Sequence, residues 1–381
     1  MEKGLIYNLH NKKKNWLVNL ALEAETAIGS LPATDREYYR KKVSDHIEKL
    51  RHQNKSFPYH ISYTESKIVK SIQTKLKDND AIITSTDKGN SMVILPTHQY
   101  HMKIQNFVDK NKFQISTTNP TKTFQNQIRN TIDSSTKLIN PDSRWKFINL
   151  NPSAPTIRGL VKLHKVDQPI RPVVNWRNAP AYKLSKLLAG KIKQFTSLPY
   201  TLNIKNSTEL IRELKHTPLT PTSKFASLDI TTLYSNIPIK EKKQILENIL
   251  THNPIDPQIK LEILNWYEII IKQNYFLNNN EIIIQKDGFA MGAPSTSILS
   301  EIFLQNIEHT HLPGLAEKHK PVNYFRFVDD ILIIYDSQHT IINAILSDFN
   351  SIHPKKQYTE ETEQNNTIDY LDITIQKNSQ T

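Results

Sequence analysis

The sequence contains no cysteine among its 381 residues. A disulfide-stapled fold, a zinc site with thiolate ligands and a cysteine nucleophile are therefore excluded. It also has no apolar run near the roughly 18 residues of a membrane span. The N-terminal stretch MEKGLIYNLHNKKKNW lacks the apolar core of a signal peptide. We expect an intracellular protein that does not interact with a membrane.

Glycine is scarce, at eight residues, and the phosphate-cradling pattern GxxxxGK[ST] is absent. Cationic residues are in excess, because 49 Lys and Arg stand against 37 Asp and Glu, a formal net charge of +12. This surplus favours a polyanionic partner such as nucleic acid, although ribosomal contacts, a membrane surface or plain solubility are also compatible. The length and the 38% hydrophobic content suffice for two or three domains with their own cores.

Two apolar runs of β-branched and aromatic residues meet at Asp329 and Asp330, in the segment YFRFVDDILIIY (residues 324–335). This pattern predicts a tight, buried β-hairpin with both carboxylates at its apex. An acidic tip can simply be solvated, because Asp favours turns. A third carboxylate on another buried strand would instead favour a metal site, which needs several oxygen ligands. Asp229 supplies it, near the end of a strand predicted over 225–230, although a turn or helix-capping role is the alternative.

Two hairpins are predicted further upstream. In the first, AIITST and SMVIL flank a polar turn at residues 87–90, with Lys88 at its tip. In the second, TIRGLVKLHK and PIRPVVNW are joined through residues 166–169, and the unit carries five basic residues and one tryptophan: Arg158, Lys162, Lys165, Arg171, Arg177 and Trp176. Basic residues interleaved with an aromatic suit a surface that binds phosphates and stacks on bases. A lysine in a turn, such as Lys88, is usually just solvated.

Apolar residues at helical spacing predict several helices. They are expected through the N-terminal region to about residue 60, around 68–76, 124–132 and 181–195, from about Pro238, around 266–272, and after Pro294. The segment NYFLNNNEIIIQ is expected to form another hairpin. Gly288 and Gly292 precede the helix at Pro294, where they either let the backbone approach a ligand closely or merely start that helix.

The order of these segments resembles that of a known family. The motifs STDKGNSMVILP, KLHKVDQPIRPVVN with its AYKLSKLL helix, SLDITTLYSNIP, GFAMGAPSTS, FRFVDD and TIDYLDITI resemble those of Penelope-like retroelement reverse transcriptases, relatives of telomerase. The resemblance runs from about Trp16 to Ile375. It implies an α+β right-hand polymerase fold with an antiparallel palm sheet. The expected parts are an N-terminal helical region (1–60), fingers (61–215) and palm (216–381), without the thumb and GIY-YIG endonuclease of other family members.

The resemblance also implies an RNA-directed DNA polymerase, a nucleotidyltransferase that adds deoxynucleotides to a DNA primer on an RNA template. Two Mg²⁺ ions, or Mn²⁺ in their place, would be bound by Asp229, Asp329 and Asp330, with the Ile230 carbonyl as an extra oxygen ligand. The family further implies a nuclear location.

Other family roles map onto the nucleotide. Lys88 and Arg171 would hold the incoming triphosphate, and Tyr234 would exclude a ribose 2′-hydroxyl. The templating base pair would be lined by one loop, formed by Met291, Gly292, Ala293 and Pro294.

Some assignments stay open. The general acid aligns best with Gln357, although Lys355 and Lys356 are its neighbours. Against the DNA polymerase stand a catalytically inert fragment that binds RNA or an RNA/DNA hybrid, and an RNA-directed RNA polymerase. Tyr234 argues against the latter, since that class generally hydrogen-bonds the 2′-hydroxyl instead of excluding it.

Overall fold

The structure is a computed structural model, which describes residues 16–377 apart from 30, 54–62, 90, 164, 197–201, 232–238, 290–291 and 354–356. The chain divides into two compact units. The first comprises Met1–Leu187, Lys272–Lys286 and Met291–Ala293, and the second comprises Leu188–Ile271, Asp287–Ala290 and Pro294–Thr381. Within the described ranges, no helix is both long and apolar enough to cross a membrane.

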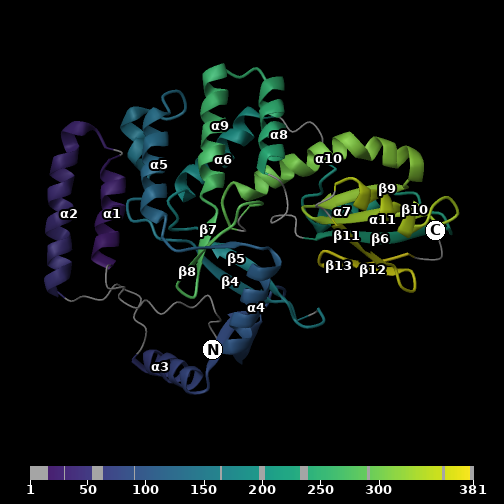
Figure 1. The fold of residues 1–381 in the computed structure, drawn as a ribbon, viewed down its shortest axis with the longest axis horizontal. Helices are drawn as coiled ribbons and strands as arrows, with labels where there is room; N and C mark the ends of the chain where they lie inside the picture. Colours follow the sequence, from purple (N-terminus) through teal and green to yellow (C-terminus); the bar gives the residue numbers. More distant parts are fainter. Residues whose placement is uncertain are drawn as a thin grey trace. The chain divides into compact units, whose positions relative to one another are not determined.

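The N-terminal part of the first unit is helical, as predicted. Helices α1 (Trp16–Ile28) and α2 (Ala33–Gln53) lie side by side, and α3 (Tyr63–Asp78) follows (Figure 1). Tyr39 and Ile68 fall at the helical spacing from which a packing face is expected, but they are 42% and 51% exposed. The periodicity therefore identified these helices without identifying what they bury.

A five-stranded sheet lies at the centre of the first unit, in the order β3-β8-β7-β4-β5. Its strands are β3 (Gln114–Ser116), β4 (Thr156–Val161), β5 (Ile170–Asn175), β7 (Tyr275–Asn278) and β8 (Glu281–Ile284). All pairings are antiparallel except that of β4 with β7. The hairpins predicted from KLHK and from NYFLNNNEIIIQ are thus confirmed.

The STDKGN hairpin forms a separate two-stranded sheet from β1 (Ala81–Ser85) and β2 (Met92–Pro96). Helix α4 (Thr97–Lys110) joins it to the larger sheet, because Tyr100 and Ile104 pack with Leu95 of β2 and with residues of β4 and β5. The Tyr100 hydroxyl also accepts a hydrogen bond from the Gly159 amide of β4 at 2.8 Å. Two further elements complete this part, α5 (Thr121–Ser134) and a short 3₁₀ helix (Pro141–Phe147), before α6 (Tyr182–Phe195).

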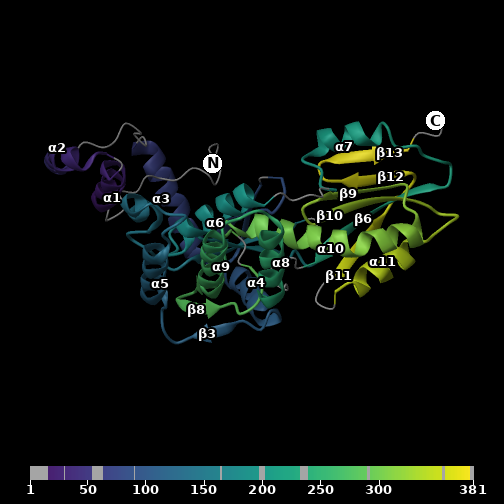
Figure 2. The same ribbon diagram turned by 90° about the horizontal axis from the view of Figure 1, so that it is seen from above.

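The second unit is built on a fully antiparallel sheet in the order β11-β6-β10-β9. Its strands are β6 (Ser223–Thr231), β9 (Asn323–Phe327), β10 (Asp330–Asp336) and β11 (Gln357–Thr362). One face is covered by α7 (Ser207–Leu214), β12 (Thr367–Tyr370) and β13 (Ile373–Gln376), and the other by α10 (Thr296–His319) and α11 (Ile342–Ser351) (Figure 2). Helices α8 (Ile239–His252) and α9 (Pro257–Lys272) complete the set.

Strand β10 is buried on both faces, as its unbroken apolar run predicts. Leu332 and Ile334 pack with Phe225, Leu210 and Tyr370 on the α7 side, and the alternate residues of β10 point to the helices. Burying each such side chain stabilises the fold by roughly 1.5–3 kcal/mol. This packing fixes the register of the two central strands, and with it the positions of their carboxylates.

Candidate active site

The apex of the β9–β10 hairpin lies one residue earlier in the chain than predicted. Phe327 pairs directly with Asp330, so the two turn residues are Val328 and Asp329, and Asp330 begins β10. Val328 has a φ of +54°. A β-branched residue rarely adopts this left-handed conformation, which costs on the order of 1–3 kcal/mol. The turn is therefore strained next to its two carboxylates.

The sheet register brings Asp229 to the same place. Asp229 of β6 lies directly opposite Asp330 of β10. Opposed residues of an antiparallel pair project from the same face, with their Cβ atoms roughly 4.5–5.5 Å apart. The carbonyl oxygen of Asp329 accepts a hydrogen bond from the Ile230 amide at 3.3 Å. The structure thus gathers the three predicted carboxylates at one end of the two central strands.

Strand β11 adds two polar residues to this face. Thr359 is opposite Asp229, and Gln357 is opposite Thr231 at the end of β6. Gln357 therefore lies on the same face as the carboxylates, whereas Lys355 and Lys356, the other candidates for the general acid, lie outside the described residues. Ile230 is paired with Tyr358, and its side chain is buried.

The charges of the aspartates also affect Tyr370, whose hydroxyl donates a hydrogen bond to the Asp330 carbonyl at 2.7 Å. Burial, and after it the negative charge of Asp330, raises the pKa of Tyr370 above its ordinary value, with a smaller contribution from Asp329. Like charges opposed on neighbouring strands repel each other. A hard divalent cation would relieve that repulsion, and carboxylate oxygens are the ligands it prefers. The three aspartates are therefore of the residue type that binds such a cation.

As the side chains stand, no group of at least three His, Cys, Asp or Glu residues in the described ranges could by itself hold a metal ion.

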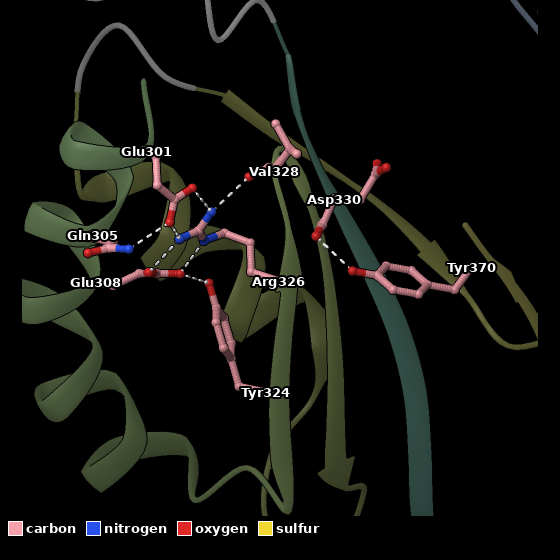
Figure 3. A network of polar contacts seen from close by, with 8 residues as sticks. All are labelled: Glu301, Gln305, Glu308, Tyr324, Arg326, Val328, Asp330 and Tyr370. Carbon is pink, nitrogen blue, oxygen red and sulfur yellow. Dashed lines mark hydrogen bonds and ion pairs between the residues drawn. The ribbon is translucent and has the colours of Figure 1, made fainter. Parts of the chain in front are cut away.

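A buried polar network that was not predicted from the sequence lies beside the turn. Arg326 of β9 is 1% exposed and lies between Glu301 and Glu308 of α10 (Figure 3). A signal for it exists in the sequence, because a lone arginine inside an apolar strand needs an anionic partner. The two glutamates are seven residues apart, two helical turns, and so share one face of the helix.

In the first unit, Arg171, which was predicted to bind the triphosphate, also has a partner that was not predicted. Arg171 of β5 is 45% exposed, and its Nε lies 3.1 Å from Oδ1 of Asp87, whose side chain is only 1% exposed. The register places Arg158 opposite Val173 and Arg171 opposite Leu160, so both arginines project from one face of the β4–β5 hairpin. A buried carboxylate therefore forms an ion pair with one of two neighbouring guanidinium groups. Lys88 is exposed in the connection between β1 and β2.

The other predicted nucleic-acid contacts have different environments. Lys165 and Arg177 are exposed, and Lys162 is half-buried. Trp176 is only 3% exposed. The expectation that its ring stacks on bases is wrong for this structure, because the ring packs inside the protein.

The glycine loop before α10 does make a close backbone approach. Gly292 has a φ of +96°, and a Cβ atom there would lie 2.1 Å from the carbonyl oxygen of Val174 in β5. The close neighbour is thus another strand of the same unit. Ala293 and Pro294 are half-buried, and α10 begins at Thr296, two residues later than predicted. Met291 and Tyr234 lie outside the described residues.

Comparison with solved structures shows the fold. Telomerase from Candida albicans, in complex with a TWJ fragment of telomeric RNA, matches with a TM-score of 0.53 at 12% identity, over 91% of this chain and 58% of that one. Telomerase from Candida tropicalis with a TWJ fragment gives 0.52 at 10% identity, over 92% and 56%. Apo telomerase from Candida tropicalis gives 0.50 at 11% identity, over 98% and 71%.

The chain spans less than two thirds of the length of both telomerases solved with RNA. At these identities the similarity concerns the fold alone, and it confirms the right-hand polymerase fold predicted from the sequence. A search of curated proteins found no match. The family model described as reverse transcriptase (RNA-dependent DNA polymerase) matches residues 163–359, just over half of the chain. The chain therefore belongs to the reverse transcriptase family.

Proposed function

We propose that this chain is an RNA-directed DNA polymerase, which adds deoxynucleotides to the 3′-hydroxyl of a DNA primer on an RNA template. The observation that carries the proposal is the direct pairing of Asp229 with Asp330, with Asp329 in the adjoining turn, in a chain of the reverse transcriptase family. Two of the similar telomerases were solved with an RNA fragment, which supports an RNA partner.

The three aspartates would hold two divalent ions, Mg²⁺ or Mn²⁺, with the Ile230 carbonyl as an additional oxygen. When bound, such ions lower the pKa of the primer hydroxyl and neutralise the charge of the leaving pyrophosphate. The fold would keep Asp229, Asp329 and Asp330 together against their mutual repulsion. Their position at the end of two strands that are packed on both faces supports this role.

Lys88 and Arg171 would bind the incoming triphosphate. The buried Asp87 supports this for Arg171, because an ion pair restricts the rotamers of the guanidinium before a nucleotide arrives. The phosphates of template and primer would be contacted by Arg158, Lys162, Lys165 and Arg177. Tyr234 would exclude the ribose 2′-hydroxyl, and the loop 291–294 would line the templating base pair.

We also propose that the fingers lie mostly in the first unit and the palm in the second. The assignment to Penelope-like elements rests on the sequence motifs, from SLDITTLYSNIP to TIDYLDITI. A nuclear location is a proposal on the same basis.

The test is primer extension on an RNA template with Mg²⁺ and deoxynucleotides. Asp229→Asn should lower the rate at least about a thousandfold, because several kcal/mol of charge stabilisation are lost. The matched control is Asp336→Asn, at the other end of β10 and opposite Ser223, roughly 20 Å from Asp330 at about 3.3 Å per residue. Full extension by Asp229→Asn, or equal loss in both variants, would remove Asp229 from the site.

A second candidate is a catalytically inert protein that binds RNA or an RNA/DNA hybrid. The formal charge of +12 and the exposed Arg158, Lys165 and Arg177 favour binding of this kind. It would be supported by the absence of any extension together with tight binding of the hybrid that weakens steeply with salt.

A further inference from the structure

The three consecutive carbonyl groups of residues 328–330, at the turn of the β9–β10 hairpin, each accept a hydrogen bond from a different element. The Val328 oxygen accepts from Nη1 of Arg326 at 3.2 Å. The Asp329 oxygen accepts from the Ile230 amide at 3.3 Å, and the Asp330 oxygen accepts from the Tyr370 hydroxyl at 2.7 Å. Only the middle bond belongs to the backbone of the sheet. The two outer bonds depend on side chains, and they flank Asp329 on both sides.

Arg326 uses all five of its N–H donors in this arrangement (Figure 3). Two go to Glu301, from Nη1 at 3.0 Å and Nη2 at 2.9 Å. Two go to Glu308, from Nε at 2.5 Å and Nη2 at 3.0 Å. The fifth reaches the Val328 carbonyl. Because the other four donors hold the guanidinium plane against α10, the fifth has a fixed direction.

The network keeps its charges in the buried site. Burial alone would raise the pKa of Glu301, but the hydrogen bonds and the charge of Arg326 outweigh it and hold that pKa below its ordinary value. The Tyr324 hydroxyl donates to Glu308 at 3.0 Å, and the Gln305 amide donates to Glu301 at 2.8 Å. The guanidinium thus has a rigid frame that comes from the helix and from its own strand.

The turn needs such support for two reasons. Val328 is held at a φ of +54°, which a β-branched residue leaves when the surrounding structure permits it. In addition, Asp330 opposes the like charge of Asp229, with Asp329 beside it. Both effects favour relaxation of the turn away from Asp229.

We propose that Arg326 and Tyr370 are positioning residues of the active site. They hold the backbone before and after Asp329, so that the carboxylates of Asp329 and Asp330 stay in place beside Asp229. The proposal rests on the proposed function, in which these carboxylates bind the divalent ions.

The test uses Tyr370→Phe, which removes one hydroxyl and keeps the buried ring. Its matched control is Tyr358→Phe, a buried tyrosine of β11 whose ring packs edge-on against Phe349. Binding of Mn²⁺ alone to the full chain is measured by electron paramagnetic resonance, and hydrogen exchange of residues 327–331 reports on the turn. Thermal melting is recorded for each variant.

Tyr370→Phe should weaken Mn²⁺ binding and lower kcat by about tenfold each, as expected for the loss of one buried hydrogen bond. Exchange at the turn should accelerate, whereas the KM for the deoxynucleotide should stay within about twofold. Arg326→Lys is the second variant. It retains the positive charge but has three donors in place of five, so we expect a larger loss of Mn²⁺ affinity with the same pattern.

The proposal is overturned if Tyr370→Phe matches Tyr358→Phe in Mn²⁺ affinity and in exchange at the turn. It is also overturned if both variants lose affinity in proportion to a common loss of melting temperature, because the effect would then be structural only. Failure of the proposed function looks different. In that case Asp329→Asn leaves Mn²⁺ affinity and extension unchanged, whatever Tyr370→Phe does.

Discussion

The loop before α10 allows a demanding test of the structure through Gly292→Ala. The new Cβ would lie 2.1 Å from the Val174 carbonyl oxygen. Non-bonded atoms normally keep roughly 3.5 Å apart, so the loop or β5 has to move by more than an ångström. The neighbour is the backbone of β5, the edge strand of the five-stranded sheet, and it cannot rotate away as a side chain could.

Two costs add up in this variant. Alanine at a φ of +96° is strained by about 1–3 kcal/mol, and overpacking typically costs a further 1–3 kcal/mol. We expect a destabilisation of about 4 kcal/mol. For a unit of about 200 residues each kcal/mol lowers the melting temperature by roughly 2–4 °C, so the loss should be about 10 °C.

The assay is thermal unfolding followed by circular dichroism, with Gly190→Ala as the matched control. Gly190 lies within α6, and a Cβ there would meet nothing within 4 Å. The same substitution should therefore stabilise the protein, by about 0.5–1 kcal/mol, because alanine favours the helix. If Gly292→Ala melts like the unmodified protein, the close approach of the loop to β5 is wrong.

The remaining predictions concern the nucleotide and the pH dependence of stability. Arg171→Ala should raise the KM for deoxynucleotides about tenfold through a lost charged hydrogen bond, while hybrid affinity stays constant; an effect on hybrid affinity alone would contradict this. Asp87→Asn should produce part of the same KM increase, and steady-state kinetics that show none would argue against its orienting role. Tyr234→Ala should increase ribonucleotide incorporation in competition assays, and unchanged selectivity would end the gate assignment. The pKa of Glu301 is lowered in the folded protein, so its ionised carboxylate stabilises the fold. This contribution is fully present above pH 4.5, the ordinary pKa of the group, and it is lost as the pH falls through the lowered pKa. Glu301→Gln should therefore lower the melting temperature at pH 7, and the melting temperature of this variant should depend less on pH below 4.5. An unchanged pH dependence in that range would refute the assignment.

Much of the fold could be predicted because local patterns agree with the tertiary structure. The run ILIIY is apolar on both faces, and such a strand has to lie between two layers, as β10 does. The hairpin apex was wrong by one residue for a local reason. Asp favours turns, which suggested Asp329 and Asp330, whereas the pairing of Phe327 with Asp330 requires a strained valine in the turn.

The contacts that could not be predicted join residues far apart in the sequence. Trp176 lies among basic residues, and only the packing of other elements around it shows that its ring is buried. The partner of Arg171 is Asp87, which looked like an ordinary turn residue. The alternation of a strand shows which residues share a face, but it cannot show which charge from another element meets them.

Templated synthesis by the three carboxylates can be measured directly as single-nucleotide addition to a labelled primer on four RNA templates that differ only in the next base. We expect the complementary deoxynucleotide to be added on each template, and we expect Asp329→Asn to abolish the addition while Asp336→Asn retains it. Addition that ignores the template base, or that persists in Asp329→Asn, would contradict an RNA-directed polymerase built on these carboxylates.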